Sequence, residues 1–287
     1  MTATVALNGY AHSRIGQIHY VRAGVGPAVV LLPQSGRSAR MFHELIPALA
    51  ADHDVIALDV PGSGRSTPPP DERFTIPDLG SWLVEAIDDL GIDRFAIYGI
   101  HGGNKIGTAI SVDEPDRVTG FVFAGRSHSI IPSTSRRNDV LEGRAAGENR
   151  RLAGSAVWRR EFREITDIWW ADETPASVAS VDVRADLVID SVQAFRWRPA
   201  FYRAVFDYDL GAALAEIAVP TMILEIATPT EDRTIGRQGD ELLRTIPGSR
   251  LTHVEASDDA PVGLDDRGDE VAHIVRTFLA GVLGESP

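Results

Sequence analysis

The 287-residue sequence contains no cysteine, which excludes disulfides, thiolate metal ligands and cysteine nucleophiles. Lysine occurs once, at Lys105, and acidic residues outnumber basic ones, so the formal net charge at pH 7 is −13. A negatively charged surface repels the phosphates of nucleic acids, which we therefore do not expect as partners. No set of His, Asp and Glu residues shows metal-ligand spacing, and we expect no metal and no other cofactor.

Long apolar runs are also missing. No segment approaches the roughly 18 continuous apolar residues that a membrane-spanning helix needs. The N-terminal residues lack the basic and apolar regions of a signal peptide. We therefore expect a cytoplasmic protein without a membrane partner.

The sequence does contain short apolar runs, and these alternate with helical patterns. The runs at 28–32, 55–58, 95–98, 118–124 and 219–224 are typical of parallel strands buried on both faces. Apolar residues recur at helical spacing between them. The alternation predicts an α/β protein with a mostly parallel, eight-stranded sheet covered by helices on both faces. Further elements are expected as an antiparallel pair at 5–7 and 16–22 joined through Asn8-Gly9, helices at 40–51, 76–90, 240–246 and 270–282, and a strand at 250–255.

The regular alternation stops between residues 127 and 211. This segment has helical patterns and many aromatic residues but no buried-strand run. We interpret it as a helical cap inserted into a core domain formed by residues 1–126 and 212–287. Its aromatic residues are expected to form either the cap's own core or an apolar lid, and we place Trp169 and Trp170 among the pocket residues.

A strand-turn-helix pattern surrounds His101. The apolar run at 95–98 is followed by Gly99, by His101, by Gly102-Gly103 and then by a helical pattern. A Gly-x-X-x-Gly turn between a strand and a helix is the layout of a nucleophile elbow. The apex of such an elbow normally carries Ser, Asp or Cys, and here it carries a histidine.

The elbow, the strand order and the loop Asp59-Val-Pro-Gly-Ser-Gly-Arg-Ser66 together resemble the α/β-hydrolase family. The resemblance is to its capped branch, which includes esterases, haloalkane dehalogenases, epoxide hydrolases and hydroxynitrile lyases. It extends over residues 5–126 and 212–283. It implies the α/β-hydrolase fold, a small-molecule substrate bound between sheet and cap, and a monomer or a homodimer.

The resemblance also implies positions for the catalytic groups. The oxyanion hole would be formed by the backbone N–H groups of Ser35 and Gly102, with Pro33-Gln34 in place of the family's His-Gly. The family's acid, after the seventh strand, falls on Pro229, with Glu231 and Asp232 just beyond. The family's histidine, after the eighth strand, is replaced by Asp259, with Asp258 as the alternative.

We therefore predict that His101 is a general base oriented by Asp259 or Asp258. A histidine hydrogen-bonded to a carboxylate has a fixed tautomer and a more basic free nitrogen. Such a base would activate water directly, so hydrolysis without a serine nucleophile is the first hypothesis. Two alternatives stay open: a lyase, C–C-cleaving enzyme or cofactor-free oxygenase with the same base, and a ligand-binding protein without turnover. The two aspartates would otherwise be solvated loop residues.

Four further residues are candidates near the pocket. Gln34 lies in the oxyanion turn, and Arg126 and His128 follow the sixth strand. Arg126 would either hold an anionic group of a substrate or form a structural ion pair. Lys105, one helical turn after His101, would lower the pKa of that histidine if it faced the pocket. We expect it instead to point away from the pocket.

Overall fold

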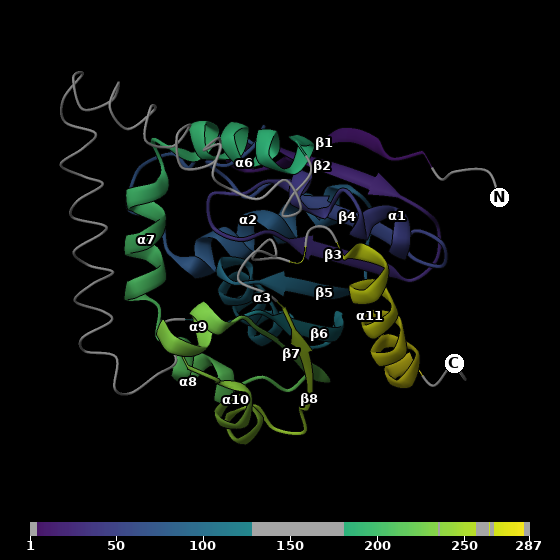
Figure 1. Cartoon of the computed structure of the whole chain (residues 1–287). Helices are drawn as coiled ribbons and strands as arrows, with labels where there is room; N and C mark the ends of the chain where they lie inside the picture. Colours follow the sequence, from purple (N-terminus) through teal and green to yellow (C-terminus); the bar gives the residue numbers. More distant parts are fainter. Residues whose placement is uncertain (1–4, 128–180, 235, 257–263, 265–266, 284–287) are drawn as a thin grey trace.

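The computed structural model describes residues 5–127, 181–234, 236–256, 264 and 267–283 (Figure 1). Its sheet has eight strands in the spatial order β1-β2-β4-β3-β5-β6-β7-β8. β2 runs antiparallel to β1 and to β4, and all other neighbours are parallel. This confirms the predicted eight-stranded, mostly parallel sheet. The strands are β1 (Leu7–Ser13), β2 (Gly16–Ala23), β3 (Ala28–Leu32), β4 (Asp54–Leu58), β5 (Phe95–Ile100), β6 (Val118–Ala124), β7 (Thr221–Ala227) and β8 (Arg250–Glu255).

Helices cover both faces of the sheet, and an apolar core lies between each face and its helices. Successive strand residues point to opposite faces, so Val30 joins one core while Val29 and Leu31 join the other. The core that contains Val29 includes residues of η1 (Ala39–Phe42), α1 (Leu45–Leu49) and α11 (Gly268–Leu283). The opposite core includes residues of α2 (Ile76–Asp89), α3 (Gly102–Asp113), α7 (Arg198–Asp207), α8 (Leu210–Ala215) and α10 (Gly239–Thr245).

The start of the chain differs from the prediction. Asn8-Gly9 is not a turn, because β1 continues through both residues and Gly9 pairs with Tyr20. A Cβ on Gly9 would lie 2.3 Å from the Tyr20 ring, so the glycine makes room for the tyrosine. The chain turns at residues 14–15 instead, before Gly16, whose φ is 133°.

The helix predicted at 40–51 is split into η1 and α1. Pro47 lies in the second piece and has no N–H to bond to the carbonyl four residues earlier, so one continuous helix could not keep its hydrogen-bond ladder.

The described part of the expected cap is helical. α6 (Val181–Ala194) contacts η1, and α7 follows it along one side of the sheet (Figure 1). Phe201 of α7 lies 5.5 Å from the ring of Phe74 and is buried in the same core as α2. The last helices before β7 thus pack directly on the sheet domain. None of the helices in the described ranges is both long and apolar enough to cross a membrane.

Candidate active site

His101 occupies the turn between β5 and α3, in a strained backbone conformation. Its φ is 48° and its ψ is −102°, a region that residues other than glycine rarely adopt. The turn packs closely on the end of β3, because a Cβ on Gly103 would lie 2.2 Å from the carbonyl oxygen of Leu32. This is the strand-turn-helix geometry of the nucleophile elbow that the sequence predicts.

The two imidazole nitrogens of His101 have different surroundings. Nδ1 lies 2.8 Å from the backbone carbonyl oxygen of Arg126. A carbonyl oxygen only accepts hydrogen bonds, so Nδ1 carries the proton and Nε2 of the neutral ring carries a lone pair. Nε2 is buried and has no hydrogen-bond partner within the described residues. A buried polar atom left unsatisfied costs stability, which is more typical of a functional group than of a structural one.

The two predicted oxyanion donors lie next to each other. A Cβ on Gly102 would be 2.8 Å from the backbone nitrogen of Ser35 and 2.0 Å from its Oγ. Only glycine fits this approach between the start of α3 and the turn after β3. Gln34 and Ser35 are both half-buried in that turn. The backbone groups of residues 35 and 102 are therefore neighbours beside His101.

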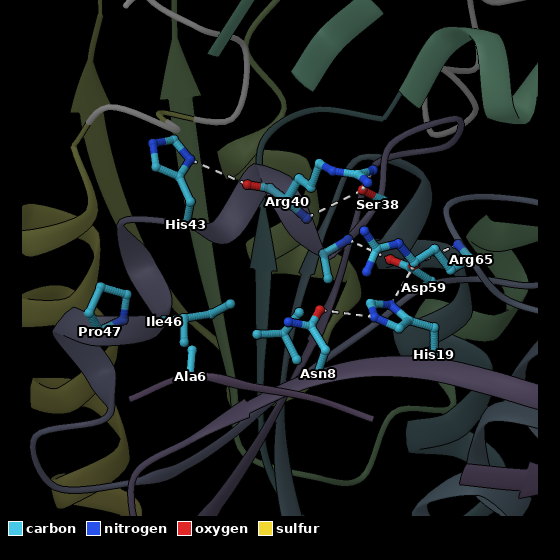
Figure 2. A pocket seen from close by; sticks show the side chains of 12 residues that line it. Ala6, Asn8, His19, Ser38, Arg40, His43, Ile46, Pro47, Asp59 and Arg65 are labelled. Atoms are coloured by element: carbon cyan, nitrogen blue, oxygen red, sulfur yellow. Dashed lines mark hydrogen bonds and ion pairs between the residues drawn. The ribbon is translucent and has the colours of Figure 1, made fainter. Parts of the chain in front are cut away.

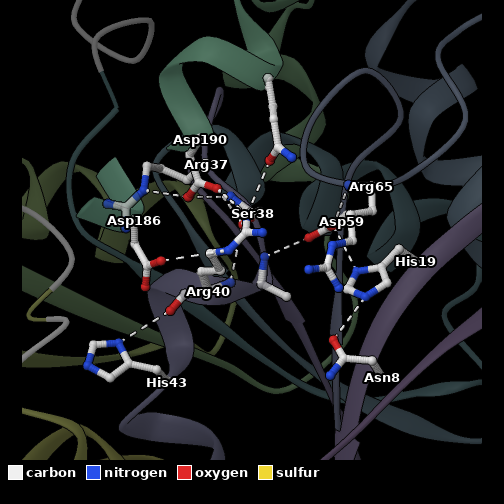
Figure 3. Close-up of polar contacts among 12 residues, drawn as sticks. Asn8, His19, Arg37, Ser38, Arg40, His43, Asp59, Arg65, Asp186 and Asp190 are labelled. Atoms are coloured by element: carbon white, nitrogen blue, oxygen red, sulfur yellow. Dashed lines mark hydrogen bonds and ion pairs between the residues drawn. The ribbon is translucent and has the colours of Figure 1, made fainter. Parts of the chain in front are cut away.

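The loop after β3 is held from one side by a carboxylate of α6 (Figure 3). Asp190 is fully buried. It accepts hydrogen bonds from the Oγ of Ser38 at 2.6 Å and from the backbone nitrogen of Ser38 at 3.1 Å. Arg37 Nε donates to it at 3.1 Å and Arg40 Nη1 at 3.2 Å. A helix of the expected cap thereby fixes the loop that carries Ser35.

A second buried carboxylate holds the same loop from the sheet. Asp59 follows β4 and accepts hydrogen bonds from the backbone nitrogens of Ala39 at 2.7 Å and Arg65 at 2.8 Å. Its Oδ2 also lies 2.8 Å from Nδ1 of His19, a buried residue of β2. Asp59 is thus a structural residue of two loops.

The side chain of Arg126 forms an ion pair within the protein. It is fully buried, bonds to Asp232 and donates to the carbonyl of Gly236 at 3.4 Å. Burial works to raise the pKa of Asp232, but hydrogen bonds from Arg126 and Arg237 outweigh it and hold that pKa below its usual value. Of the two roles considered for Arg126, the described residues show the structural ion pair and not a cation free to bind an anion. The backbone carbonyl of Arg126 is its contact with His101.

Lys105 is buried, and its side chain points toward the end of β6. Its Nζ donates to Oγ of Ser127 at 2.7 Å, and within the described part of the chain no carboxylate pairs with it. The backbone of Ser127 is fixed by Gln238, which accepts from its nitrogen at 2.8 Å and donates to its carbonyl at 2.6 Å. Burial without a counter-charge lowers the pKa of Lys105 to about 8.

We expect the variant Lys105→Met to be more stable than the wild type at pH 7, by up to about 3 kcal/mol. The folded-state pKa is about 8 and the unfolded value is 10.5, so below pH 8 the folded protein carries a buried charge that destabilises it. As the pH rises from 8 to 10.5, the unfolded chain binds more protons and the wild type gains stability. The gap between the two proteins should therefore narrow by pH 10, measured by urea unfolding at both pH values. A difference in the free energy of unfolding that does not change with pH would contradict the lowered pKa of Lys105.

Several predicted site residues lie outside the described residues. These are Asp258, Asp259, His128, Trp169 and Trp170. The pairing of His101 with either aspartate therefore stays a prediction, as does the pocket role of the other three. No group of three or more His, Asp or Glu residues in the described ranges is arranged to hold a metal ion.

The fold and the elbow define a protein of the α/β-hydrolase fold, and comparisons with known proteins agree. Residues 27–145 match the family model described as alpha/beta hydrolase fold. The crystal structure of an enol-lactonase from Burkholderia xenovorans superposes with a TM-score of 0.74 at 20% identity, over 95% of this chain and all of that one. This likeness shows the fold.

Two sequence relatives are hydrolases by name. An uncharacterized hydrolase of Saccharomyces cerevisiae is 33% identical over 108 residues, which is 37% of each protein. A putative carbamate hydrolase of Pseudomonas savastanoi pv. phaseolicola is 26% identical over 83% of this chain and 89% of the relative. The first relatives found are matched over no more than 38% of their own length.

Proposed function

We propose that the chain is a hydrolase that cleaves a small, partly apolar ester or lactone by direct attack of water, with His101 as the general base. The observation that carries this proposal is the lone pair on Nε2 of His101, held at an elbow beside the backbone of Ser35 and Gly102. The names of a sequence relative, a putative carbamate hydrolase, and of a structural neighbour, an enol-lactonase, support hydrolysis at a carbonyl carbon.

In this mechanism Nε2 takes a proton from water while the water oxygen bonds to the carbonyl carbon of the substrate. The N–H groups of Ser35 and Gly102 donate to the carbonyl oxygen as it becomes negative. The intermediate then collapses, the bond to the leaving oxygen breaks, and that oxygen takes the proton from the imidazolium. The products are a carboxylic acid and an alcohol, which are one molecule when the substrate is a lactone.

The carbonyl of Arg126 changes the role proposed for the aspartates. It holds the Nδ1 proton of His101, so Nδ1 needs no carboxylate to fix the tautomer. We propose that Asp259, with Asp258 as the alternative, acts by its charge and stabilises the imidazolium when it forms. The remaining pocket residues proposed are Gln34, His128, Trp169 and Trp170, while Arg126 acts through its backbone.

The test is a panel of esters and lactones assayed in water labelled with heavy oxygen, together with a fluorophosphonate probe. We expect turnover, one labelled oxygen in the product acid after a single turnover, and no covalent adduct by intact-protein mass spectrometry. Product analysis also separates hydrolysis from elimination, C–C cleavage or oxygenation, which would use the same base. A fluorophosphonate adduct that maps to a serine and abolishes turnover would overturn the proposal. Ligand binding without turnover across the panel would overturn it as well.

A further inference from the structure

A pocket lies beside the loop after β3, and His101 is not among the residues that line it (Figure 2). It has a volume of about 280 Å³ and opens between β2, the loop after β3, α1 and the loop after β4. This is just below the range of about 300–1,000 Å³ that holds drug-sized ligands, so the pocket suits a smaller molecule. No part of the proposed hydrolysis uses it.

Apolar and cationic residues line different sides of this pocket. Figure 2 shows Ala6, Ile46 and Pro47 grouped on one side, Arg65 beside Asp59 on the other, and Arg40 next to Ser38. The apolar side belongs to the N-terminal segment and α1. The cationic side is made by two loops that follow neighbouring strands, so an elongated ligand would meet hydrocarbon at one end and guanidinium groups at the other.

The two arginines differ in whether a carboxylate of the protein already pairs with their guanidinium group. Arg40 bonds to Asp190 at 3.2 Å and approaches Asp186 at 3.7 Å. The guanidinium of Arg65 has no hydrogen bond or ion pair with any part of the chain that the structure describes, although its backbone nitrogen bonds to Asp59. Asp59 in turn accepts hydrogen bonds from two backbone nitrogens and contacts His19. Arg65 is exposed at the mouth of the pocket, so its guanidinium is free to pair with an anion that enters there.

We propose that this pocket binds a small aliphatic monocarboxylate, with the carboxylate on Arg65 and the hydrocarbon chain against Ile46 and Pro47. An Arg guanidinium matches a carboxylate with two parallel hydrogen bonds, and the size of the cavity limits the chain to a few carbons. The inference is independent of the proposed hydrolase activity, because none of the residues it uses takes part in the proposed hydrolysis.

The test is isothermal titration calorimetry on the full chain with acetate, butanoate and hexanoate, and with hexanamide as the uncharged match. We expect hexanoate to bind more tightly than acetate, because the apolar wall adds contact area, and hexanamide not to bind. The variant Arg65→Ala should weaken hexanoate binding by about tenfold or more, as expected when a charge-assisted hydrogen bond is lost. Arg94→Ala, which removes an exposed arginine that does not line this pocket, should bind as the wild type does.

Two further variants locate the bound carboxylate. Val21→Phe places a larger side chain in the pocket and should abolish binding, whereas His101→Gln should leave it unchanged. The proposal is overturned if the wild type does not bind hexanoate, or if Arg65→Ala and Val21→Phe both bind hexanoate with wild-type affinity. Binding that is lost in His101→Gln but kept in Arg65→Ala would place the carboxylate at the elbow instead, and would also overturn it.

Discussion

Replacing His101 with glutamine is expected to lower kcat/KM by about 10²–10⁴-fold, the usual contribution of a general base. The amide of glutamine can still donate a hydrogen bond to the carbonyl of Arg126, but it has no lone pair that takes a proton near neutral pH. The backbone strain at φ 48° remains in the variant, so the loss reports the imidazole and not a relaxed turn. The measurement is steady-state kinetics on whichever ester or lactone the wild type turns over.

The matched control is His273→Gln, because His273 is an exposed histidine of α11 whose side chain forms no hydrogen bond within the described residues. We expect unchanged kinetics there, and urea unfolding of both variants should stay within about 1 kcal/mol of the wild type. Wild-type activity in His101→Gln would show that the imidazole is not the base. Hydrolysis would then need another residue, and the elbow would have only a structural role.

The sheet and the elbow were predictable because local patterns determine them. The apolar runs at 28–32 and 95–98 are long enough to indicate strands buried on both faces, and glycines mark where the chain turns. The first hairpin was not predictable in the same way. Asn-Gly is a strong turn signal, yet Gly9 lies inside β1 because the Tyr20 ring packs over it. A tertiary contact outweighed the local preference.

The position of the candidate base was also readable from the sequence, but its surroundings were not. The bond from His101 to the carbonyl of Arg126 joins residues 25 apart and uses no side chain of the partner, so no residue type signals it. Lys105 offered one signal, as the single lysine of the chain, but its burial depends on α3 packing against the end of β6. Asp190 offered none, since an acid on an amphipathic helix is usually solvated.

Asp190 nevertheless leads to the largest stability effect that we expect. Asp190→Ala should lower the free energy of unfolding by about 3–5 kcal/mol, because the variant removes the buried carboxylate of an ion-pair cluster. Ser38 loses the acceptor for both its hydroxyl and its backbone nitrogen, across 152 residues of sequence. The matched control is Asp186→Ala, one turn earlier on α6, which removes a partly exposed carboxylate 3.7 Å from Arg40 and should cost less than about 1 kcal/mol.

The same substitution tests whether α6 positions the oxyanion loop. Ser35 lies three residues before Ser38, so release of Ser38 from Asp190 should shift the Ser35 N–H that we propose as a donor to the substrate oxygen. A displacement of about 1 Å at such a donor can cost about 10²-fold in rate. We therefore expect kcat of the folded Asp190→Ala protein to fall by up to that factor with KM less affected, and Asp190→Asn, which keeps an acceptor oxygen, to recover part of it. A loss of stability with unchanged kcat would make Asp190 a structural residue alone, because the turn at Ser35 would then be held sufficiently by Gly102 and by the bond from Ala39 to Asp59.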